Sequence, residues 1–258
     1  MIAREGIELM NQNNSNQQQI LIGIPLYKNF DALDVVGPHQ TFYMQHPTLT
    51  TLLVGPARND AVESYEHLKI LPDCCFDSSP QLDVLFVPGG VRFDDTLCDQ
   101  TYIGFLKRQA AKAKLVTSVC TGALLLAAAG LLDGYKATIH WGYKSVLKLF
   151  PDVIVADGYP RFVIDANRIT GGGISSGLDE AMAIVSVLVG NDAAKRGQLI
   201  MQYAPQPIFN DGDPSTAEPS VLYDVSTDLR SSVESLSKKV QQVLSGQCEK
   251  PAGKSAGK

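Results

Sequence analysis

The chain has 258 residues, of which 45% are hydrophobic, and its formal net charge is -5. One α/β domain of roughly 200 residues with tails fits this length as well as two domains do. The acidic balance, without a block of Lys or Arg, argues against nucleic-acid binding, and no apolar run reaches the roughly 18 residues of a membrane span.

The N-terminal segment is polar. Residues 1–18 are rich in Asn and Gln, and we expect them to form a disordered leader. They do not resemble a signal peptide, which predicts a cytoplasmic protein. The number of cysteines is odd and no Cys-x-x-Cys pair has a matching His, so we expect free thiols and neither a disulfide nor a metal site. The five cysteines are Cys74, Cys75, Cys98, Cys120 and Cys248.

In the first half of the chain, short apolar runs that predict strands alternate with segments whose apolar residues have the spacing of a helix. The apolar run at residues 83–87 is short and ends sharply at Pro88-Gly89-Gly90, which is typical of a buried strand. Pro38 is a good first helical residue, so a helix is expected to begin near it. Strands are expected at residues 19–27, 51–54, 83–87 and 114–119, a hairpin at 62–70, and a further helix at 101–114.

The second half continues the alternation as far as residue 203. Residues 204–219 are rich in Pro, Asp and Gly and predict a long loop, and the apolar spacing after Leu222 predicts an amphipathic helix. We expect the loop and helix, 204–245, to pack on the α/β domain, 19–203, or on a second subunit, and 246–258 to be a disordered tail. Strands are expected at 137–140, 153–156 and 162–164, and helices at 121–129, 141–150, 178–189 and 192–203.

This alternation predicts the α/β class: a doubly wound, mostly parallel sheet with helices on both faces. In such sheets ligands bind at the carboxyl ends of the strands. Three features are expected at that edge, namely Asp34, the pair Gly89-Gly90, and Cys120. The sequence therefore places its chemically interesting residues in one region.

Cys120 lies in the stretch TSVCTGALLLAAAG, between a predicted strand and a predicted helix. A strand-to-helix turn presents a nucleophile, and the amides of the following helix favour a thiolate. The alternative is a small buried core residue, as most free cysteines are. We favour the functional interpretation because of the position on the turn.

Asp34 and the two glycines each have a functional and a structural interpretation. Asp34 stands between Leu33 and Val35 and either handles a proton or caps a helix. Gly89 and Gly90 either offer N–H groups to a substrate or form an ordinary tight turn. His140 is expected to be a core histidine rather than a pocket residue.

Five segments together resemble the DJ-1/PfpI (ThiJ) superfamily, over residues 19 to 203. They are LDVVGP at 33–38, VLFVPGG at 84–90, VTSVCTGALLLAAAGLLDG at 116–134, ATIHW at 137–141 and RITGGGISSGLDEA at 168–181. Within the superfamily the chain is most similar to the isocyanide hydratases, because the stretch QLIMQYAPQPIFNDGDPSTA at 198–217 extends the likeness into the long loop.

The resemblance implies a flavodoxin-like, class I glutamine amidotransferase-like fold and a homodimer. It implies that Cys120 is a nucleophile on an elbow, that Asp34 is its acid/base partner and that Thr121 is a hydroxyl neighbour. Gly89 and Gly90 would supply backbone contacts, and Ile174 a backbone group in the pocket. The expected enzyme is a lyase that converts a small-molecule isocyanide to an N-substituted formamide without metal or organic cofactor.

Two positions depart from other members of the superfamily. Many relatives have His where this chain has Thr121, and many have Glu where it has Asp34. The first departure argues against a Cys–His pair, which weakens the alternative of a glyoxalase- or deglycase-like enzyme acting on 2-oxoaldehydes. A third hypothesis is a non-enzymatic oxidation sensor, because a reactive thiol beside an acid also forms sulfenic or sulfinic acid.

Overall fold

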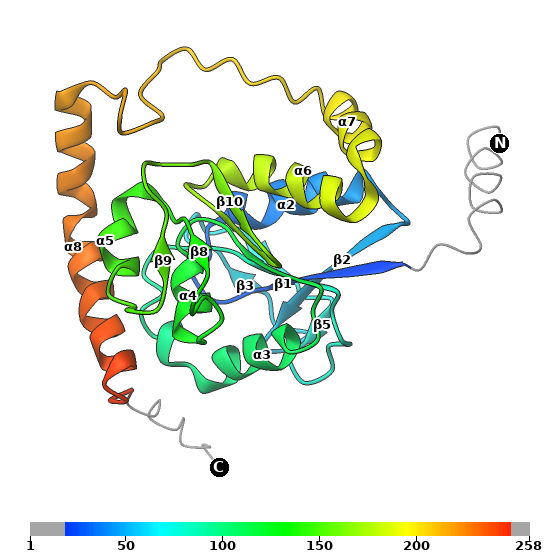
Figure 1. Ribbon diagram of the computed structural model, residues 1–258. Helices are drawn as coiled ribbons and strands as arrows, with labels where there is room; N and C mark the ends of the chain where they lie inside the picture. Colours follow the sequence, from blue (N-terminus) through cyan, green and yellow to red (C-terminus); the bar gives the residue numbers. More distant parts are fainter. Residues whose placement is uncertain (1–18, 249–258) are drawn as a thin grey trace.

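The computed structural model describes residues 19–248, so the predicted leader at 1–18 and residues 249–258 of the predicted tail lie outside the described residues. Its centre is a seven-stranded sheet in the order β10-β11-β7-β6-β1-β2-β5, in which only β10 is antiparallel to its neighbour (Figure 1). The strands are β1 (Ile20–Pro25), β2 (Leu49–Gly55), β5 (Cys74–Cys75), β6 (Val84–Val87), β7 (Leu115–Ser118), β10 (Phe162–Asp165) and β11 (Arg168–Gly171).

Helices cover both faces of this sheet, which confirms the predicted doubly wound α/β fold (Figure 1). One face carries α2 (Ala32–Tyr43), α6 (Ser176–Val189) and α7 (Asn191–Ile200). The other carries η1 (Thr96–Cys98), α3 (Gln100–Ala110), α4 (Gly122–Ala128), η2 (Trp141–Tyr143) and α5 (Lys144–Leu147). Two small pairs, β3 (Val62–Glu63) with β4 (Lys69–Ile70) and β8 (Lys136–Ala137) with β9 (Ile154–Val155), lie outside the main sheet.

The core forms where apolar strands are buried on both faces. All four residues of β6 are buried, as are all four of β7. Residues 122–127 of α4 are buried too, so this short helix packs entirely within the molecule beside the two central strands. Burying apolar surface on both faces of the central strands is the main stabilising contribution, and it holds the turn after β7 in a fixed position.

The first helix begins earlier than the sequence predicts. α2 begins at Ala32, and Pro38 lies inside it rather than at its start. The Ala32 N–H, one of the donors left free at a helix N-terminus, donates to Glu66 Oε2 at 3.0 Å. Glu66 is 34 residues away in sequence, so the sequence around Pro38 could not indicate this earlier start.

The C-terminal helix α8 (Pro219–Leu244) packs on the edge of the domain after a long loop, which arches from α7 to α8 in Figure 1. Leu236 and Val240 of α8 are buried in the core. The Tyr143 hydroxyl and Ser232 Oγ are 3.0 Å apart, which joins η2 to the middle of the helix. Within the described chain, α8 therefore packs on its own domain.

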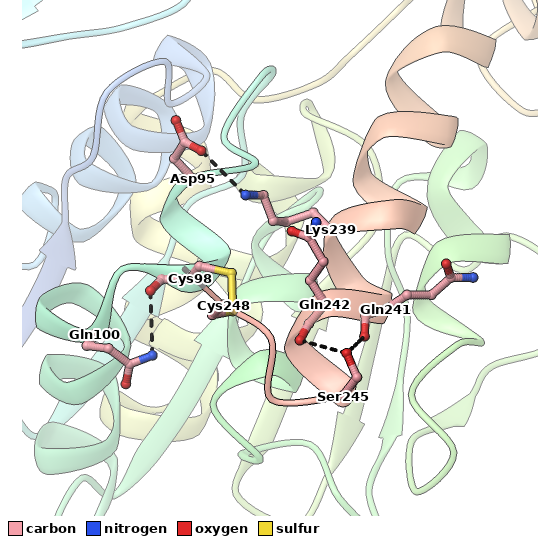
Figure 2. The surroundings of a disulfide bond; sticks show 8 residues. All are labelled: Asp95, Cys98, Gln100, Lys239, Gln241, Gln242, Ser245 and Cys248. Carbon is pink, nitrogen blue, oxygen red and sulfur yellow. Dashed lines mark hydrogen bonds and ion pairs between the residues drawn. A yellow bond between two sulfur atoms is a disulfide. The ribbon is translucent and has the colours of Figure 1, made fainter. Parts of the chain in front are cut away.

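A disulfide joins Cys98 to Cys248, so the prediction that all five thiols are free is wrong (Figure 2). The two cysteines are 150 residues apart in sequence, and tertiary packing brings η1 beside the end of α8. An ion pair between Lys239 and Asp95 lies beside the bond. Cys248 belongs to the segment predicted to be a disordered tail, and it is covalently attached to the domain. Cys74, Cys75 and Cys120 are free thiols.

Among the helices of residues 19–248, none combines the length and the apolar character that crossing a membrane requires.

Candidate functional site

Cys120 occupies the turn between β7 and α4, as the sequence predicts. Its φ is +57°, a left-handed conformation that is uncommon for a residue with a side chain. The turn is fixed from the neighbouring strand, because the Cys120 N–H donates to the Gly172 carbonyl at 2.8 Å. Only 4% of the residue is exposed. A strained backbone held this firmly is typical of a residue that the fold positions for function.

Asp34 points inward from the first turn of α2 and is completely buried. Its Oδ2 accepts the Gly89 N–H at 2.9 Å. Its Oδ1 has no hydrogen-bond partner among residues 19–248. The alternative that Asp34 caps a helix is wrong, because Asp31 holds the N-cap position and Asp34 lies inside the helix.

Asp34 and Cys120 both lie close to Gly89, on the side where a Cβ atom would be. A Cβ added to Gly89 would lie 2.8 Å from Asp34 Oδ2 and 2.8 Å from Cys120 Cβ, and 2.6 Å from the Thr121 nitrogen. The two side chains therefore face each other across a space that only glycine leaves open. The structure thus brings together three of the residues that the sequence singled out.

The Thr121 hydroxyl forms two hydrogen bonds with the backbone of Gly90. Thr121 Oγ1 accepts the Gly90 N–H at 2.9 Å and donates to the Gly90 carbonyl at 2.9 Å. Together with the bond from Gly89 to Asp34, this means that both glycine N–H groups already donate within the protein. Substrate contacts by these two groups remain a prediction, and they require the exchange of an existing bond.

Burial changes the charge expected at the site. It is the main cause that raises the pKa of the Cys120 thiol well above its usual value, and the charge of Asp34 adds to the effect. The Thr121 backbone N–H acts in the opposite direction but does not reverse the shift. Burial likewise raises the pKa of Asp34. The direction of this shift is opposite to the one expected from the helix N-terminus alone, because desolvation acts against the charged thiolate.

A pocket of about 430 Å³ is lined by neighbours of the buried pair, although neither Asp34 nor Cys120 lines it directly. It is lined by Leu33 and Gly172, neighbours of Asp34 and of the Cys120 backbone, and by Ile174, which the sequence placed in the pocket. The other lining residues include the aromatic or apolar side chains Ile139, His140, Trp141, Tyr159, Pro160 and Pro214, and the polar side chains Arg161, Ser175 and Asp213. Such a concave, mostly apolar lining is typical of a small-molecule site.

His140 lies in this pocket rather than in the core, contrary to the favoured interpretation. Its Nδ1 accepts the Gly142 N–H at 3.2 Å. Burial lowers the pKa of His140 to about 4, so the ring is neutral at physiological pH. The histidine thus contributes an uncharged aromatic wall.

Sequence reasoning missed an acid pair at the start of α2. Asp31 is buried, and burial together with the neighbouring Glu66 raises its pKa to about 7. The signal that identified Asp34, an acid among apolar residues, is also present at Asp31 in Phe30-Asp31-Ala32-Leu33. Nothing in the sequence around Glu66 indicates that it reaches this helix.

No group of three or more His, Cys, Asp or Glu side chains that could hold a metal ion occurs within residues 19–248.

Comparison with known proteins identifies close relatives of this chain. It is 40% identical over 205 residues to an isonitrile hydratase of Pseudomonas putida, covering 79% of this chain and 86% of that protein. The crystal structure of a ThiJ/PfpI family protein from Pseudomonas syringae superposes with a TM-score of 0.81 at 33% identity, covering 89% of this chain and 94% of the other.

A more distant likeness shows the fold alone. Drosophila melanogaster DJ-1beta superposes with a TM-score of 0.65 at 19% identity, covering 73% of this chain and all of that one. The family model named DJ-1/PfpI family matches residues 19–187, the part that contains the whole central sheet. The chain is therefore a member of the DJ-1/PfpI family.

Proposed function

We propose that the protein is an enzyme, a cofactor-independent hydratase that converts isocyanides to N-substituted formamides. The observation that carries the proposal is the meeting of Asp34 and Cys120 over Gly89, beside an apolar pocket. The 40% identity to an isonitrile hydratase, isonitrile being another word for isocyanide, supports the same chemistry.

In the first step the thiol adds to the terminal carbon of R–N≡C. The Cys120 sulfur forms the new C–S bond, and the thiol proton, passed through the Asp34 carboxyl group, is delivered to the same carbon. The product is a thioimidate, R–N=CH–S–Cys120, and no electrons are gained or lost. Burial of both groups suits this step, because it keeps the proton on the pair and excludes water until the carbon is bound.

In the second step water hydrolyses the thioimidate. Asp34, a carboxylate after it has delivered the first proton, takes a proton from water as the oxygen attacks the carbon and passes this proton to the imine nitrogen. Breaking the C–S bond then releases R–NH–CHO, and the hydroxyl proton of the intermediate returns to the sulfur. The sum is one isocyanide plus one water giving one formamide, with the enzyme regenerated.

The pocket agrees with this substrate class. The –N≡C group is linear and narrow, which suits a nucleophile on a residue that is only 4% exposed. Its R group would occupy the pocket against His140, Trp141 and Tyr159. These three aromatic walls, of which His140 is neutral, favour a bulky apolar R group, and Arg161 and Asp213 line another part of the pocket.

The test is turnover of a para-substituted phenyl isocyanide, followed by the absorbance of the formamide. Cys120→Ala should abolish turnover, since no neighbouring group replaces the sulfur. Absence of turnover with aliphatic and aromatic isocyanides, in protein whose Cys120 still reacts with iodoacetamide, would contradict the proposal. Lactate formation from methylglyoxal that depends on Cys120 would instead support the 2-oxoaldehyde alternative.

The oxidation-sensor alternative is less well supported by the site. A sensor thiol is exposed and has a lowered pKa, whereas Cys120 is buried and burial raises its pKa. Mass spectrometry that finds two added oxygens on Cys120 under mild peroxide, without turnover of any substrate, would favour the sensor.

We also propose a homodimer and a cytoplasmic location. Large apolar side chains are exposed on adjacent helices of one face: Leu33, Val36, Tyr43, Val187, Leu199 and Ile200. A second copy of the chain would remove this surface from water. Light scattering should therefore give twice the 27.8 kDa of one chain, and a monomer at micromolar concentration would contradict the dimer.

A further inference from the structure

A buried carboxyl group outside the proposed mechanism lies directly behind the catalytic turn. Glu180 and Ser176 are one turn apart on α6, and neither has any exposed surface. Both oxygens of Glu180 and the hydroxyl of Ser176 have no hydrogen-bond partner among residues 19–248. Three buried polar atoms without partners in one place require an explanation, because each destabilises the folded state unless it is hydrogen-bonded.

These polar atoms converge on the backbone of β11. A Cβ added to Gly171 would lie 2.4 Å from Glu180 Oε2 and 3.2 Å from Ser176 Oγ. The two side chains therefore point at the same spot, close enough for one water to bridge them. Gly171 leaves room for them because it has no side chain.

The same stretch of backbone holds Cys120. Gly171 is followed by Gly172, whose carbonyl accepts the Cys120 N–H at 2.8 Å. The Cβ position of Gly171 is also 3.2 Å from Val119 Cγ2, so Glu180 and Val119, the residue before Cys120, both lie close to Gly171. A shift of the Glu180 carboxyl group would be transmitted to the turn within two residues.

The charge of Glu180 is set by its surroundings. Burial raises its pKa well above the usual value, and the charge of Asp34 from α2 adds to the shift. No Lys or Arg pairs with it among the described residues. Burial therefore favours the protonated form of Glu180, which has an O–H donor for water and adds no second negative charge near the sulfur.

We propose that a buried water bridges Glu180 and Ser176, and that Glu180 is a positioning residue for Cys120, acting through the Gly171–Gly172 peptide. The proposal rests on Cys120 as the nucleophile and does not depend on which substrate it attacks. It extends the functional site to a third element, α6, behind the sheet.

The experiment compares Glu180→Gln with Glu180→Leu. Gln is uncharged, keeps the shape and can hold the water, whereas Leu removes every polar atom. Glu180→Leu should lower the rate of Cys120 alkylation by iodoacetamide by about tenfold or more and change its pH profile, and Glu180→Gln should stay within about twofold. Glu234→Gln, at an exposed position of α8, is the matched control and should change nothing.

Alkylation does not require isocyanide turnover, so it separates failure of this proposal from failure of the proposed function. Rescue by Gln but not by Leu supports the positioning role. An equal loss of alkylation rate in Glu180→Gln and Glu180→Leu overturns it, because a titrating carboxyl group would then be required. An unchanged rate in both variants also overturns it. If Glu180→Leu does not fold, Ser176→Ala takes its place and should change the pH profile in the same direction. A crystal structure without water between Glu180 and Ser176 would refute the bridge.

Discussion

Gly89→Ala tests the central geometric claim, that glycine allows the acid and the nucleophile to meet. The new Cβ would lie 2.6 Å from the Thr121 nitrogen and 2.8 Å from both Asp34 Oδ2 and Cys120 Cβ. Ordinary van der Waals contact begins at 3.4 Å, so these atoms must separate by about 0.6–0.8 Å. Gly89 does not have a positive φ, so any effect comes from this crowding rather than from backbone strain.

Overpacking of this size costs about 1–3 kcal/mol of stability, and a displacement near 1 Å costs about 100-fold in rate. We therefore expect kcat/KM for a phenyl isocyanide to fall about 100-fold while the variant still folds, as judged by circular dichroism and thermal melting. The control is Gly104→Ala in α3, whose Cβ would meet only Arg108 Nη1 at 3.5 Å. That change should leave activity intact and stabilise the helix by about 1 kcal/mol. Near-normal kcat/KM in a folded Gly89→Ala variant would refute the reasoning.

Three further predictions follow from the site and the disulfide. Asp34→Asn should lower kcat by about 100-fold or more while the fold survives, because the proton carrier is lost; full activity would return Asp34 to a structural role. The pKa of Asp31 is about 7 in the folded protein against 3.8 for the free side chain, so the folded state binds the extra proton. Stability should therefore fall as pH rises from about 4 to about 7, and Asp31→Asn should flatten that slope in urea titrations. Cys98→Ser should lower stability by about 2–5 kcal/mol and expose α8 to trypsin, and unchanged proteolysis would contradict the proposed attachment.

The disulfide also bears on the proposed cytoplasmic location. Disulfides persist mainly in oxidising compartments, and Cys98 is joined to Cys248 in the structure. Trapping thiols with a mass-tagged alkylating reagent in intact cells would measure the state of this pair directly. Two free thiols in the native compartment would agree with the cytoplasm, and a stable bond would argue for an oxidising location.

Most of the fold was readable from local patterns. The burial of β6 on both faces follows from the unbroken apolar run in residues 84–87, and the helix after Cys120 ends where Gly130, with a φ of +70°, allows the chain to turn. The start of α2 was not readable, because its first free amide is satisfied by Glu66 from a distant hairpin. The Cys98–Cys248 bond was missed for the same reason, since only packing brings η1 to the end of α8.

The sequence by itself determined the order of strands and helices, the turn that carries Cys120, and the candidacy of Asp34 and Gly89, because periodicity and turn residues are local properties. Only the tertiary structure decided how these residues act together. It placed Asp34 and Cys120 next to each other beside Gly89, and it paired the N–H groups of Gly89 and Gly90 with Asp34 and Thr121. It also buried the thiol, which raises its pKa instead of favouring the thiolate. Desolvation and close approach depend on what surrounds a residue in space, and neighbours in sequence do not reveal that.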